Sequence, residues 1–337
     1  MISEQNIKDA YSRIQGLIRN TPILESHFLE QSLGHKIFFK AESLQVTGAF
    51  KIRGVLNALL LLKEQNSLPK KIVAYSSGNH AFAVAWAAKH FGLKAKIYMA
   101  NFSSPLKMQI VRDLGAELIT TRTRIEAEIK SREEGSLNGN LFLHPSANED
   151  IIAGAASLCY ETLIELKEKN SLPDAIFASC GGGALISGSF LAKNIFDKNI
   201  KMFGAEPKIA NDASRSYKKG CIVGYTESPK TIADGARTLK VSELAFSYLK
   251  QIDGFIESSE EEIIYWTAWL NHLLKINCEP TCALAMASAY KWLKKQTSPQ
   301  TILVMLSGGN NDQESMKKVW KKDHLQKVPR LPRHKVL

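Results

Sequence analysis

The chain has 337 residues, of which 45% are hydrophobic and 23% charged, a composition typical of globular proteins with about two domains. The formal net charge is +11, but residues 317–337 hold eight Lys or Arg against the single Asp323, so we do not expect nucleic acid as a partner except through this tail. No apolar run reaches the ~18 residues that cross a bilayer and the polar amino terminus lacks a signal-peptide pattern, which predicts a cytoplasmic protein without membrane contact.

From residue 70 onward, short apolar segments alternate with longer helical ones. The apolar segments predict strands at residues 71–77, 94–100, 117–121, 141–145, 174–180, 201–207, 255–259 and 301–306. Helices are predicted at residues 79–92, 104–116, 124–135, 149–170, 181–196, 261–276 and 282–296. This alternation indicates parallel sheets with crossover helices, so the expected fold class is α/β with two open, twisted, mostly parallel sheets flanked by helices.

A glycine-rich turn lies between a predicted strand and a predicted helix, where open parallel sheets bind their ligands. Its residues are Gly181, Gly182, Gly183 and Ala184. Converging backbone N–H groups and a helix N-terminus suit a small phosphate group, although a tight turn alone is an equally good explanation. The turn has neither the ending of a nucleotide P-loop nor the spacing of a dinucleotide fingerprint.

Three further turns contain glycine. "SSGNHA", residues 76–81, offers hydroxyl and amide groups at a helix N-terminus, which favours a bound carboxylate. N-capping would explain one of its serines but not the whole run. "SGGN", residues 307–310, and "ADG", residues 233–235, are less specific. A serine after the last strand can hydrogen-bond a ligand ring nitrogen, and capping competes equally with that role.

Lys51 lies between the apolar residues Phe50 and Ile52. Taken alone, it is best explained by a stem packed on apolar neighbours and an ammonium group in water. However, "TGAFKIRG", "SSGNHA", "GGGALISG" and "LSGGN" follow one another in an order and spacing that resembles the pyridoxal-phosphate (PLP) enzymes of the serine/threonine dehydratase and serine racemase family, of fold type II. The resemblance extends over residues 21–312 and leaves out only the basic tail.

The resemblance implies a role for each matching residue. Lys51 is implied to form the Schiff base with the cofactor aldehyde, because an apolar pocket lowers a lysine pKa and supplies a neutral amine. The remaining cofactor contacts are implied to be Phe50 beside the ring, Asn79 on its phenolic oxygen, Gly181, Gly182, Gly183 and Ala184 with Gly235 around the phosphate, and Ser307 at the ring nitrogen. The substrate carboxylate is implied to bind Ser76, Ser77, Gly78, Asn79 and His80, and Ser77 to lie on the substrate face opposite Lys51.

The resemblance also implies a divalent-cation site and a domain arrangement. Glu206, the carbonyl group of Ala210 and Asp212 offer hard oxygen ligands that suit Mg²⁺ or Ca²⁺, and a pair of surface acids is the alternative. We expect a homodimer with a small amino-acid substrate. The cofactor is expected in the cleft between two domains, the larger formed by residues 1–52 plus 148–320 and the smaller by residues 53–147, with residues 321–337 as a basic and poorly ordered tail.

Some positions depart from the family pattern. Ala184 replaces a glycine, and Ala49 replaces a serine before the Phe-Lys pair. The stretch at Ala153–Ser157 lacks a glutamine expected near the cleft, and Ala81 with Phe82 replaces Gly-Gln. These changes leave the implied cofactor contacts in place and affect the substrate side.

The expected reaction is loss of water and ammonia from a β-hydroxy amino acid, of which L-threonine and L-serine are the first candidates. Lys51 is implied to remove the α-proton, and a serine at the ring nitrogen favours loss of a β-leaving group over transamination. Two alternatives use the same residues: racemisation, in which Ser77 returns a proton to the opposite face, and dehydration of 3-hydroxyaspartate or an aryl serine. A non-catalytic binding protein is not favoured, because a pure binder does not need a desolvated lysine.

Overall fold

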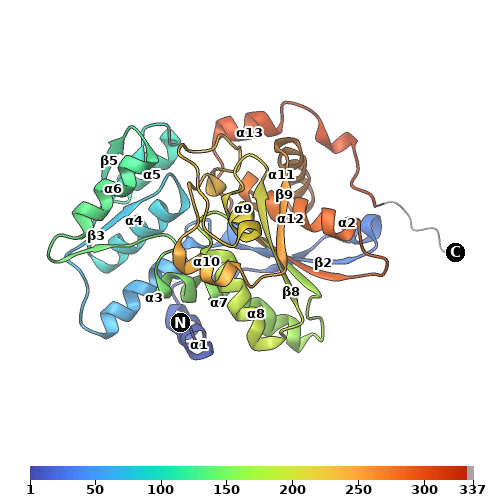
Figure 1. The fold of residues 1–337 in the computed structure, drawn as a ribbon, viewed down its shortest axis with the longest axis horizontal. Coiled ribbons are helices and arrows are strands. Elements are labelled where there is room, and N and C mark those ends of the chain that lie inside the picture. Colours follow the sequence, from blue (N-terminus) through green and yellow to red (C-terminus); the bar gives the residue numbers. More distant parts are fainter. Residues whose placement is uncertain (332–337) are drawn as a thin grey trace.

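The computed structural model describes residues 1–331 and shows two α/β lobes side by side (Figure 1). Each lobe is built on one sheet, one of six strands and one of four. All strand pairs are parallel except the first, in which β1 runs antiparallel to β2. The predicted α/β fold class is therefore confirmed. No helix within residues 1–331 is long and apolar enough to cross a membrane.

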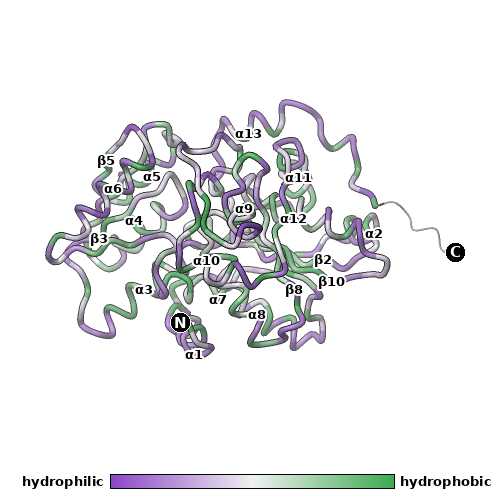
Figure 2. Tube along the Cα trace, in the orientation of Figure 1, coloured by the Kyte–Doolittle hydropathy of each residue, from purple (hydrophilic) through white to green (hydrophobic). Residues whose placement is uncertain are grey.

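The six-stranded sheet forms the large lobe and draws its strands from both ends of the chain. In spatial order the strands are β1 (Ile23–Glu25), β2 (Lys36–Ala41), β10 (Thr301–Leu306), β7 (Ala175–Ser179), β8 (Lys201–Pro207) and β9 (Gly254–Ser258). Its central strands are apolar on both faces, as expected where helices cover a parallel sheet on both sides. Figure 2 shows hydrophobic residues along β8 and β10 inside a more hydrophilic outer layer.

The alternation of side chains along β10 divides the core of the large lobe into two layers. Leu303 and Met305 pack into a layer with α7 and α8, whereas Ile302, Val304 and Leu306 pack into a second layer with α11 and α12. The helices of the large lobe are α1 (Glu4–Ile14), α2 (His27–Leu33), α7 (Glu149–Glu168), α8 (Ala184–Phe196), α9 (Asp212–Lys219), α10 (Glu243–Leu249), α11 (Glu260–Leu274), α12 (Pro280–Leu293) and α13 (Gln313–Val319), with short 3₁₀ turns η1 (Glu42–Leu44), η2 (Asp234–Ala236) and η3 (His324–Gln326).

The four-stranded sheet forms the small lobe and uses one continuous part of the chain. Its strands are, in spatial order, β5 (Glu117–Thr121), β4 (Lys94–Ala100), β3 (Lys71–Tyr75) and β6 (Asn140–Phe142). They alternate with α4 (Asn79–Phe91), α5 (Pro105–Asp113) and α6 (Arg124–Gly135). Helix α3 (Lys51–Glu64) leads into this lobe and packs against α7 of the large lobe.

The contact between α3 and α7 brings two backbones together. A Cβ atom on Gly54 would lie 2.7 Å from the carbonyl oxygen of Ile151, and one on Gly154 would lie 2.6 Å from the Cα atom of Gly54. Both positions therefore require glycine. The close packing places the first turn of α3, which carries Lys51, at the junction of the two lobes.

The C-terminal segment differs from the sequence expectation. Residues 321–331 were expected in a poorly ordered tail, but Leu325, Val328 and Leu331 pack against the core layer that contains α11 and α12. The main chain is also held there, because Tyr290 donates a hydrogen bond from its hydroxyl group to the carbonyl oxygen of Arg330 at 2.7 Å. The part of the predicted tail beyond residue 331 lies outside the described residues.

Candidate active site

A cavity of about 1070 Å³ lies between the lobes, where strands of both sheets end. It collects residues from every motif of the predicted cofactor and substrate site. The predicted residues that line it are Phe50, Lys51, Ser76, Ser77, Gly78, Asn79, His80, Gly181, Gly182, Gly183, Ala184, Gly235 and Ser307. The predicted metal ligands Glu206, Ala210 and Asp212 do not line it.

The glycine-rich turn connects β7 to α8 and leaves no room for side chains. A Cβ atom on Gly181 would lie 2.2 Å from the carbonyl oxygen of Gly235, and one on Gly182 would lie 2.5 Å from Oγ of Ser146. Gly183 has a φ of +96°, in the left-handed region. Ala184 is the first residue of α8, so the turn points the free N–H groups of a helix N-terminus into the cavity.

Lys51 begins α3 and its side chain enters the cavity. Its Nζ donates a hydrogen bond to the carbonyl oxygen of Pro145 at 3.3 Å and lies 4.9 Å from the centre of the Phe50 ring. Burial lowers the pKa of Lys51 to about 8, because desolvation disfavours the charged amine. At neutral pH a usable fraction of the amine is therefore neutral, as nucleophilic attack requires.

A buried ionic network fixes the start of α3. Arg53 is fully buried and donates to Glu42 of η1 at 2.8 Å and to Glu161 of α7 at 3.0 Å. Lys40 of β2 also contacts Glu161, and Thr21 donates to Glu42 at 2.6 Å. Buried ion pairs contribute little to stability once desolvation is counted. Their position, two residues from Lys51, indicates that this network orients the lysine.

Ser307 follows the last strand of the large lobe, as predicted, and is buried beside two other polar groups. Ser179 donates from its hydroxyl group to Oγ of Ser307 at 3.4 Å, and Sγ of Cys282 lies 3.7 Å from the same oxygen. All three side chains are uncharged hydrogen-bonding groups, so Ser307 offers a neutral hydrogen bond to a ligand.

The 76–80 loop joins β3 to α4 and presents the first amides of the helix to the cavity. Such amides have no acceptor within the helix and suit a carboxylate. Asn79 links the two lobes: its Nδ2 donates to both carboxylate oxygens of Glu279, at 2.9 and 3.2 Å, and its Oδ1 accepts from Asn310 at 2.9 Å. Burial, and then the charge of Asp234, raise the pKa of Glu279 to about 7.

The imidazole of His80 is held in one tautomer. Nε2 of His80 donates to the carbonyl oxygen of Leu143 at 2.9 Å, which leaves Nδ1 as a buried acceptor without a partner. Burial, and then the charge of Lys51, lower the pKa of His80 to about 3, so the ring is neutral. A carboxylate would therefore bind the backbone amide of His80 and not its ring, because an acceptor nitrogen repels an anion.

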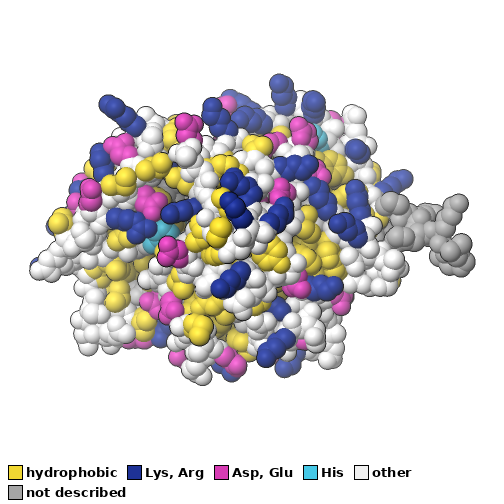
Figure 3. All heavy atoms as spheres, in the orientation of Figure 1, with side chains coloured by type: hydrophobic (Ala, Val, Ile, Leu, Met, Phe, Trp, Pro, Cys, Tyr) yellow, Lys and Arg dark blue, Asp and Glu magenta, His cyan; other side chains and the backbone are white. Residues whose placement is uncertain are grey.

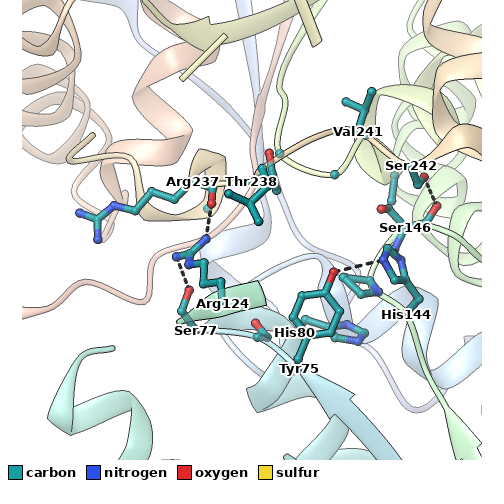
Figure 4. Close-up of a pocket in the computed structure, with 18 of the residues that line it drawn as sticks. Tyr75, Ser77, His80, Arg124, His144, Ser146, Arg237, Thr238, Val241 and Ser242 are labelled. Atoms are coloured by element: carbon teal, nitrogen blue, oxygen red, sulfur yellow. Dashed lines mark hydrogen bonds between the residues drawn. The ribbon is translucent and has the colours of Figure 1, made fainter. Parts of the chain in front are cut away.

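Sequence reasoning missed Arg124, which begins α6 and reaches across the cavity (Figure 4). Its Nη2 donates to Oγ of Ser77 at 2.7 Å and its Nη1 donates to the carbonyl oxygen of Arg237 in the large lobe. Its Nε is buried without a partner. Burial lowers the pKa of Arg124 to about 10, and no carboxylate within residues 1–331 forms a salt bridge with it.

Two further groups in this region were also missed. Tyr75 and His144 face each other in Figure 4 and are joined by a hydrogen bond of 3.2 Å between the hydroxyl oxygen and Nε2. Because Nδ1 of His144 accepts from the amide of Ala147 at 2.7 Å, Nε2 carries the proton and donates it. Behind Gly78, Lys107 of α5 forms a buried ion pair with Asp234 of η2, which is a second polar link between the lobes.

Comparison with known proteins agrees with this geometry. Residues 14–308 match the model of the family described as pyridoxal-phosphate dependent enzymes. The chain belongs to this family. The resemblance inferred from the sequence motifs is thus confirmed.

Similar proteins in the pyridoxal-phosphate dependent enzyme family have related activities. The chain is 35% identical to L-threo-3-hydroxyaspartate ammonia-lyase from Saccharomyces cerevisiae, over 91% of this chain and 93% of that protein. It is also 35% identical to serine racemase from Schizosaccharomyces pombe, over 92% and 94%. The crystal structure of a threonine deaminase from T.th. superposes with a TM-score of 0.86 at 36% identity, and the match covers 92% of this chain and 99% of that one.

The residues of the cavity fit the cofactor of this family. The glycine turn offers helix N-terminal amides at a place where no side chain fits, which suits the phosphate group. Oγ of Ser146 beside this turn is buried without a partner and can donate to a phosphate oxygen. Lys51 offers a buried amine that suits covalent attachment, and Ser307 offers a neutral group that suits the ring nitrogen.

The predicted metal ligands are arranged around the turn from β8 into α9. Both oxygens of Glu206 accept backbone N–H groups, from Ala213 at 3.1 Å and from Ser214 at 2.6 Å, whereas Oδ2 of Asp212 is buried without a partner. Burial raises the pKa of Asp212 to about 7 and, with the charge of Asp212, raises the pKa of Glu206. No cluster of three or more His, Cys, Asp or Glu side chains placed to bind a metal occurs in the described chain.

Two of the departures from the family pattern lie away from the cavity. Phe82 does not line the cavity, so the replacement at residues 81 and 82 leaves the substrate side unchanged. Ala155 is buried within α7, and the neighbouring Ser157 accepts from Arg53 at 3.3 Å. This segment supports the network that orients Lys51 and does not line the cavity.

Proposed function

We propose that this protein removes water and ammonia from a β-hydroxy amino acid with an acidic side chain, of the 3-hydroxyaspartate kind, ahead of L-serine and L-threonine. The single observation behind this substrate choice is Arg124, a buried guanidinium in the cavity that forms no salt bridge with a carboxylate in residues 1–331. The charge of Asp234, which forms its salt bridge with Lys107, acts on Arg124 without direct contact. A buried cation without a counter-ion is costly. An anionic group on the substrate would remove that cost.

The cofactor and the cavity residues have different roles in the proposed reaction. When bound, pyridoxal phosphate supplies an aldehyde that links to a primary amine and a conjugated ring that stabilises negative charge at the substrate α-carbon. Lys51 would hold the cofactor through Nζ, and the same Nζ, when free, would accept the α-proton of the substrate. The carbonyl oxygen of Pro145 orients this amine. The β-hydroxyl group would leave as water with one proton, which balances the proton that Nζ accepts. One water molecule would then hydrolyse the released enamine to a 2-oxo acid and ammonia, so that ammonia is the net loss.

The small lobe would hold the two carboxylates of the substrate at separate places. The backbone amides of Asn79 and His80, at the N-terminus of α4, suit the α-carboxylate. Arg124 lies beside Ser77 of the same loop, 2.7 Å from its hydroxyl oxygen. A guanidinium there can form a two-point hydrogen bond with the β-carboxylate. L-Serine and L-threonine lack this group, so they would leave Arg124 unpaired.

The test is release of 2-oxo acid from L-threo-3-hydroxyaspartate, L-serine, D-serine and L-threonine by the wild-type protein and by Arg124→Gln. We expect the highest kcat/KM for 3-hydroxyaspartate. Arg124→Gln should lower that value by about 100-fold, because loss of a charged hydrogen bond to a substrate carboxylate costs a few kcal/mol. The same variant should lower kcat/KM for L-serine by less than about fivefold.

Arg132 provides the matched control. It lies on α6 two turns beyond Arg124 and also lines the cavity, but it is paired with Glu128 at 2.8 Å. Arg132→Gln should change kcat/KM for both substrates by less than about threefold. Equal losses for 3-hydroxyaspartate and L-serine in Arg124→Gln, or a wild-type preference for L-serine or L-threonine, would contradict the acidic-substrate proposal.

Racemisation is a second candidate, favoured by the presence of a hydroxyl group and an amine in one cavity. Ser77 and Lys51 both line it, and the positive charge of Arg124 beside Oγ of Ser77 stabilises negative charge that develops on that oxygen. Ser77 can then exchange a proton with the α-carbon from its own side. Formation of the opposite enantiomer faster than release of 2-oxo acid, measured in the same substrate series, would identify racemisation as the main reaction.

We also propose that Glu206, the carbonyl group of Ala210 and Asp212 hold Mg²⁺ or Ca²⁺. The support is a pair of buried carboxylates that interact with each other, together with the unpartnered Oδ2 of Asp212. Hard divalent cations prefer oxygen ligands of this kind.

A further inference from the structure

The C-terminal segment forms a basic surface that the proposed catalytic function does not use. Between residues 317 and 331 the chain carries six cations and one anion, Asp323. We call these cations the basic strip: Lys317, Lys318, Lys321, Lys322, Lys327 and Arg330. All six are exposed, and Lys317 is paired with the exposed Glu314 at 2.9 Å. Lys and Arg side chains are frequent over the region of α13 and α11 in Figure 3.

The basic strip is held on a fixed scaffold. The carbonyl oxygen of Lys327 accepts hydrogen bonds from Tyr265 at 2.8 Å and from Trp269 at 3.2 Å, both on α11. Val319 is fully buried, between two pairs of strip lysines in the sequence KKVWKK. The cations therefore lie along one path on the surface. Because their backbone is already ordered, binding of a ligand costs less conformational entropy than it would on a flexible tail.

Trp320 is an aromatic residue among the lysines of the basic strip. It is 47% exposed and lies in sequence between Lys318 and Lys321. An exposed tryptophan among lysines combines a stacking surface with phosphate-binding charge, which is the combination that single-stranded nucleic acids require. A membrane surface suits the segment less well, because its apolar residues Val319, Leu325 and Val328 face the protein core and are not available for insertion.

We propose that the basic strip with Trp320 binds single-stranded nucleic acid, with phosphates on the lysines and a base stacked on the indole ring. The sequence alone made a nucleic-acid partner unexpected, because a poorly ordered tail would be a solvated charge run. The ordered path and the exposed Trp320 change that expectation. The proposal is independent of the substrate assignment, since none of the strip residues lines the cavity.

The test uses the full-length, cofactor-loaded protein and a fluorescein-labelled oligouridine of about 20 nucleotides, with binding followed by fluorescence anisotropy at several salt concentrations. Binding should weaken with salt, with a slope of about −0.7 per neutralised phosphate. Lys317→Gln, Lys318→Gln, Lys321→Gln and Lys322→Gln combined should reduce that slope by about 3. Trp320→Ala should weaken binding by about tenfold with little change of slope, and Trp320→Phe should restore most of the loss.

A variant with four exposed lysines replaced elsewhere keeps the net charge matched. Its substitutions are Lys94→Gln, Lys167→Gln, Lys198→Gln and Lys219→Gln. This control should bind oligouridine as the wild type does, and every variant should keep wild-type turnover. Poly-L-glutamate and vesicles with about 30% phosphatidylserine serve as alternative polyanions.

The proposal is supported if oligouridine binding is lost in the strip variant and kept in the control. It is overturned if both variants lose binding equally, because binding would then follow net charge alone. It is also overturned if the wild type binds vesicles or poly-L-glutamate as tightly as oligouridine, or if it binds none of them at about 50 mM salt.

Discussion

The two walls of the active-site cavity differ in the chemical groups that form them. On the large lobe, the part of the wall that suits the cofactor, which we call the large-lobe wall, consists of backbone and small side chains: the turn at residues 181–184, Gly235 and Ser307. Charged residues of this lobe, among them Asp234, Arg237 and Glu279, line the cavity elsewhere. On the small lobe, it consists of polar and charged side chains, among them Ser77 and Arg124. A backbone wall cannot be changed without a Cβ clash, whereas a side-chain wall can be changed one residue at a time.

Because of this difference, we expect one wall to determine the type of reaction and the other to determine which substrate is accepted. The large-lobe wall suits the phosphate and ring of a cofactor, which are the same in every member of the family, and Lys51 at the junction of the lobes is the reactive amine that we propose. The small-lobe wall meets the part of the substrate that varies. We therefore expect substitutions on the large-lobe wall to affect every substrate, and substitutions on the small-lobe wall to affect substrates selectively.

The largest effect is expected at the junction itself. Lys51→Ala should abolish turnover of all substrates and the absorbance at about 410 nm that marks covalent attachment, because the variant lacks the amine that we propose forms the link to the cofactor. Lys63→Ala, at the exposed end of the same helix, is the matched control and should keep both. A thermal melt should show that both variants fold. Near-normal turnover in Lys51→Ala would refute the assignment of the catalytic amine.

A substitution in the large-lobe wall should weaken binding of the cofactor and so lower turnover of every substrate. Gly182→Ala would place a methyl group 2.5 Å from Oγ of Ser146, so we expect the affinity for pyridoxal phosphate to fall by about tenfold or more. Titration of the cofactor-free protein, followed by fluorescence, measures this loss. Adding Ser146→Gly removes the clash and should recover part of the affinity. Ser146→Gly alone is the reference, because Ser146 can itself donate to the phosphate. If Gly182→Ala lowers the affinity by the same factor in the Ser146→Gly background as in the wild type, the close approach of these two residues is not the cause.

The pH dependence of cofactor capture reports on the amine of Lys51. Only the neutral amine attacks the aldehyde, and its fraction rises as pH rises through the pKa. Because burial lowers that pKa to about 8 from 10.5, the capture rate of the cofactor-free protein should reach half of its maximum near pH 8. Stopped-flow absorbance measures this rate. A half-maximal rate above pH 10 would mean that Lys51 is not desolvated.

The smallest effect is expected outside the cavity, at Glu206 and Asp212. If they hold a divalent cation, a chelator should lower the melting temperature by about 2–4 °C. The loss should grow as pH rises through about 7, because Asp212, whose folded pKa is raised to about 7, then becomes charged beside Glu206 and destabilises the folded state.

Asp212→Asn should remove the response to the chelator, since one of the two carboxylates is then neutral. Glu257→Gln is the control: this carboxylate is close by but pairs with Lys218 at 2.9 Å, and the variant should respond as the wild type does. A melting curve unchanged by the chelator in the wild-type protein would remove the metal proposal.

Elements with a strong local pattern were predicted well from the sequence. The helix expected at residues 149–170 is α7, Glu149–Glu168, and the strand expected at residues 174–180 is β7, Ala175–Ser179. Elements before residue 50 were not predicted. Strand β1 has only three residues and exists through its antiparallel pairing with β2. The positions of Lys51 and the glycine turn followed from motifs of adjacent residues, which a single sequence displays directly.

The groups that choose the substrate and join the lobes could not be predicted in this way. Arg124 lies 47 residues from its partner Ser77, Lys107 lies 127 residues from Asp234, and Asn79 lies 200 residues from Glu279. Arg124 and Lys107 are unremarkable among their own neighbours in the chain, and the motif that contains Asn79 does not indicate its contact with Glu279. They meet only because two sheets place the carboxyl ends of their strands at one cleft.

The sequence by itself therefore determined the α/β fold class, because local hydrophobic periodicity follows from the backbone geometry of short segments. Its motifs, through the family resemblance, indicated where we propose the reactive lysine and the phosphate-binding turn. The tertiary structure decided three other properties: the unpaired cation in the cavity, the ionic network behind Lys51, and the fixed path of the basic C-terminal segment. Each depends on contacts between distant parts of the chain, and such contacts leave no periodic signal in the sequence.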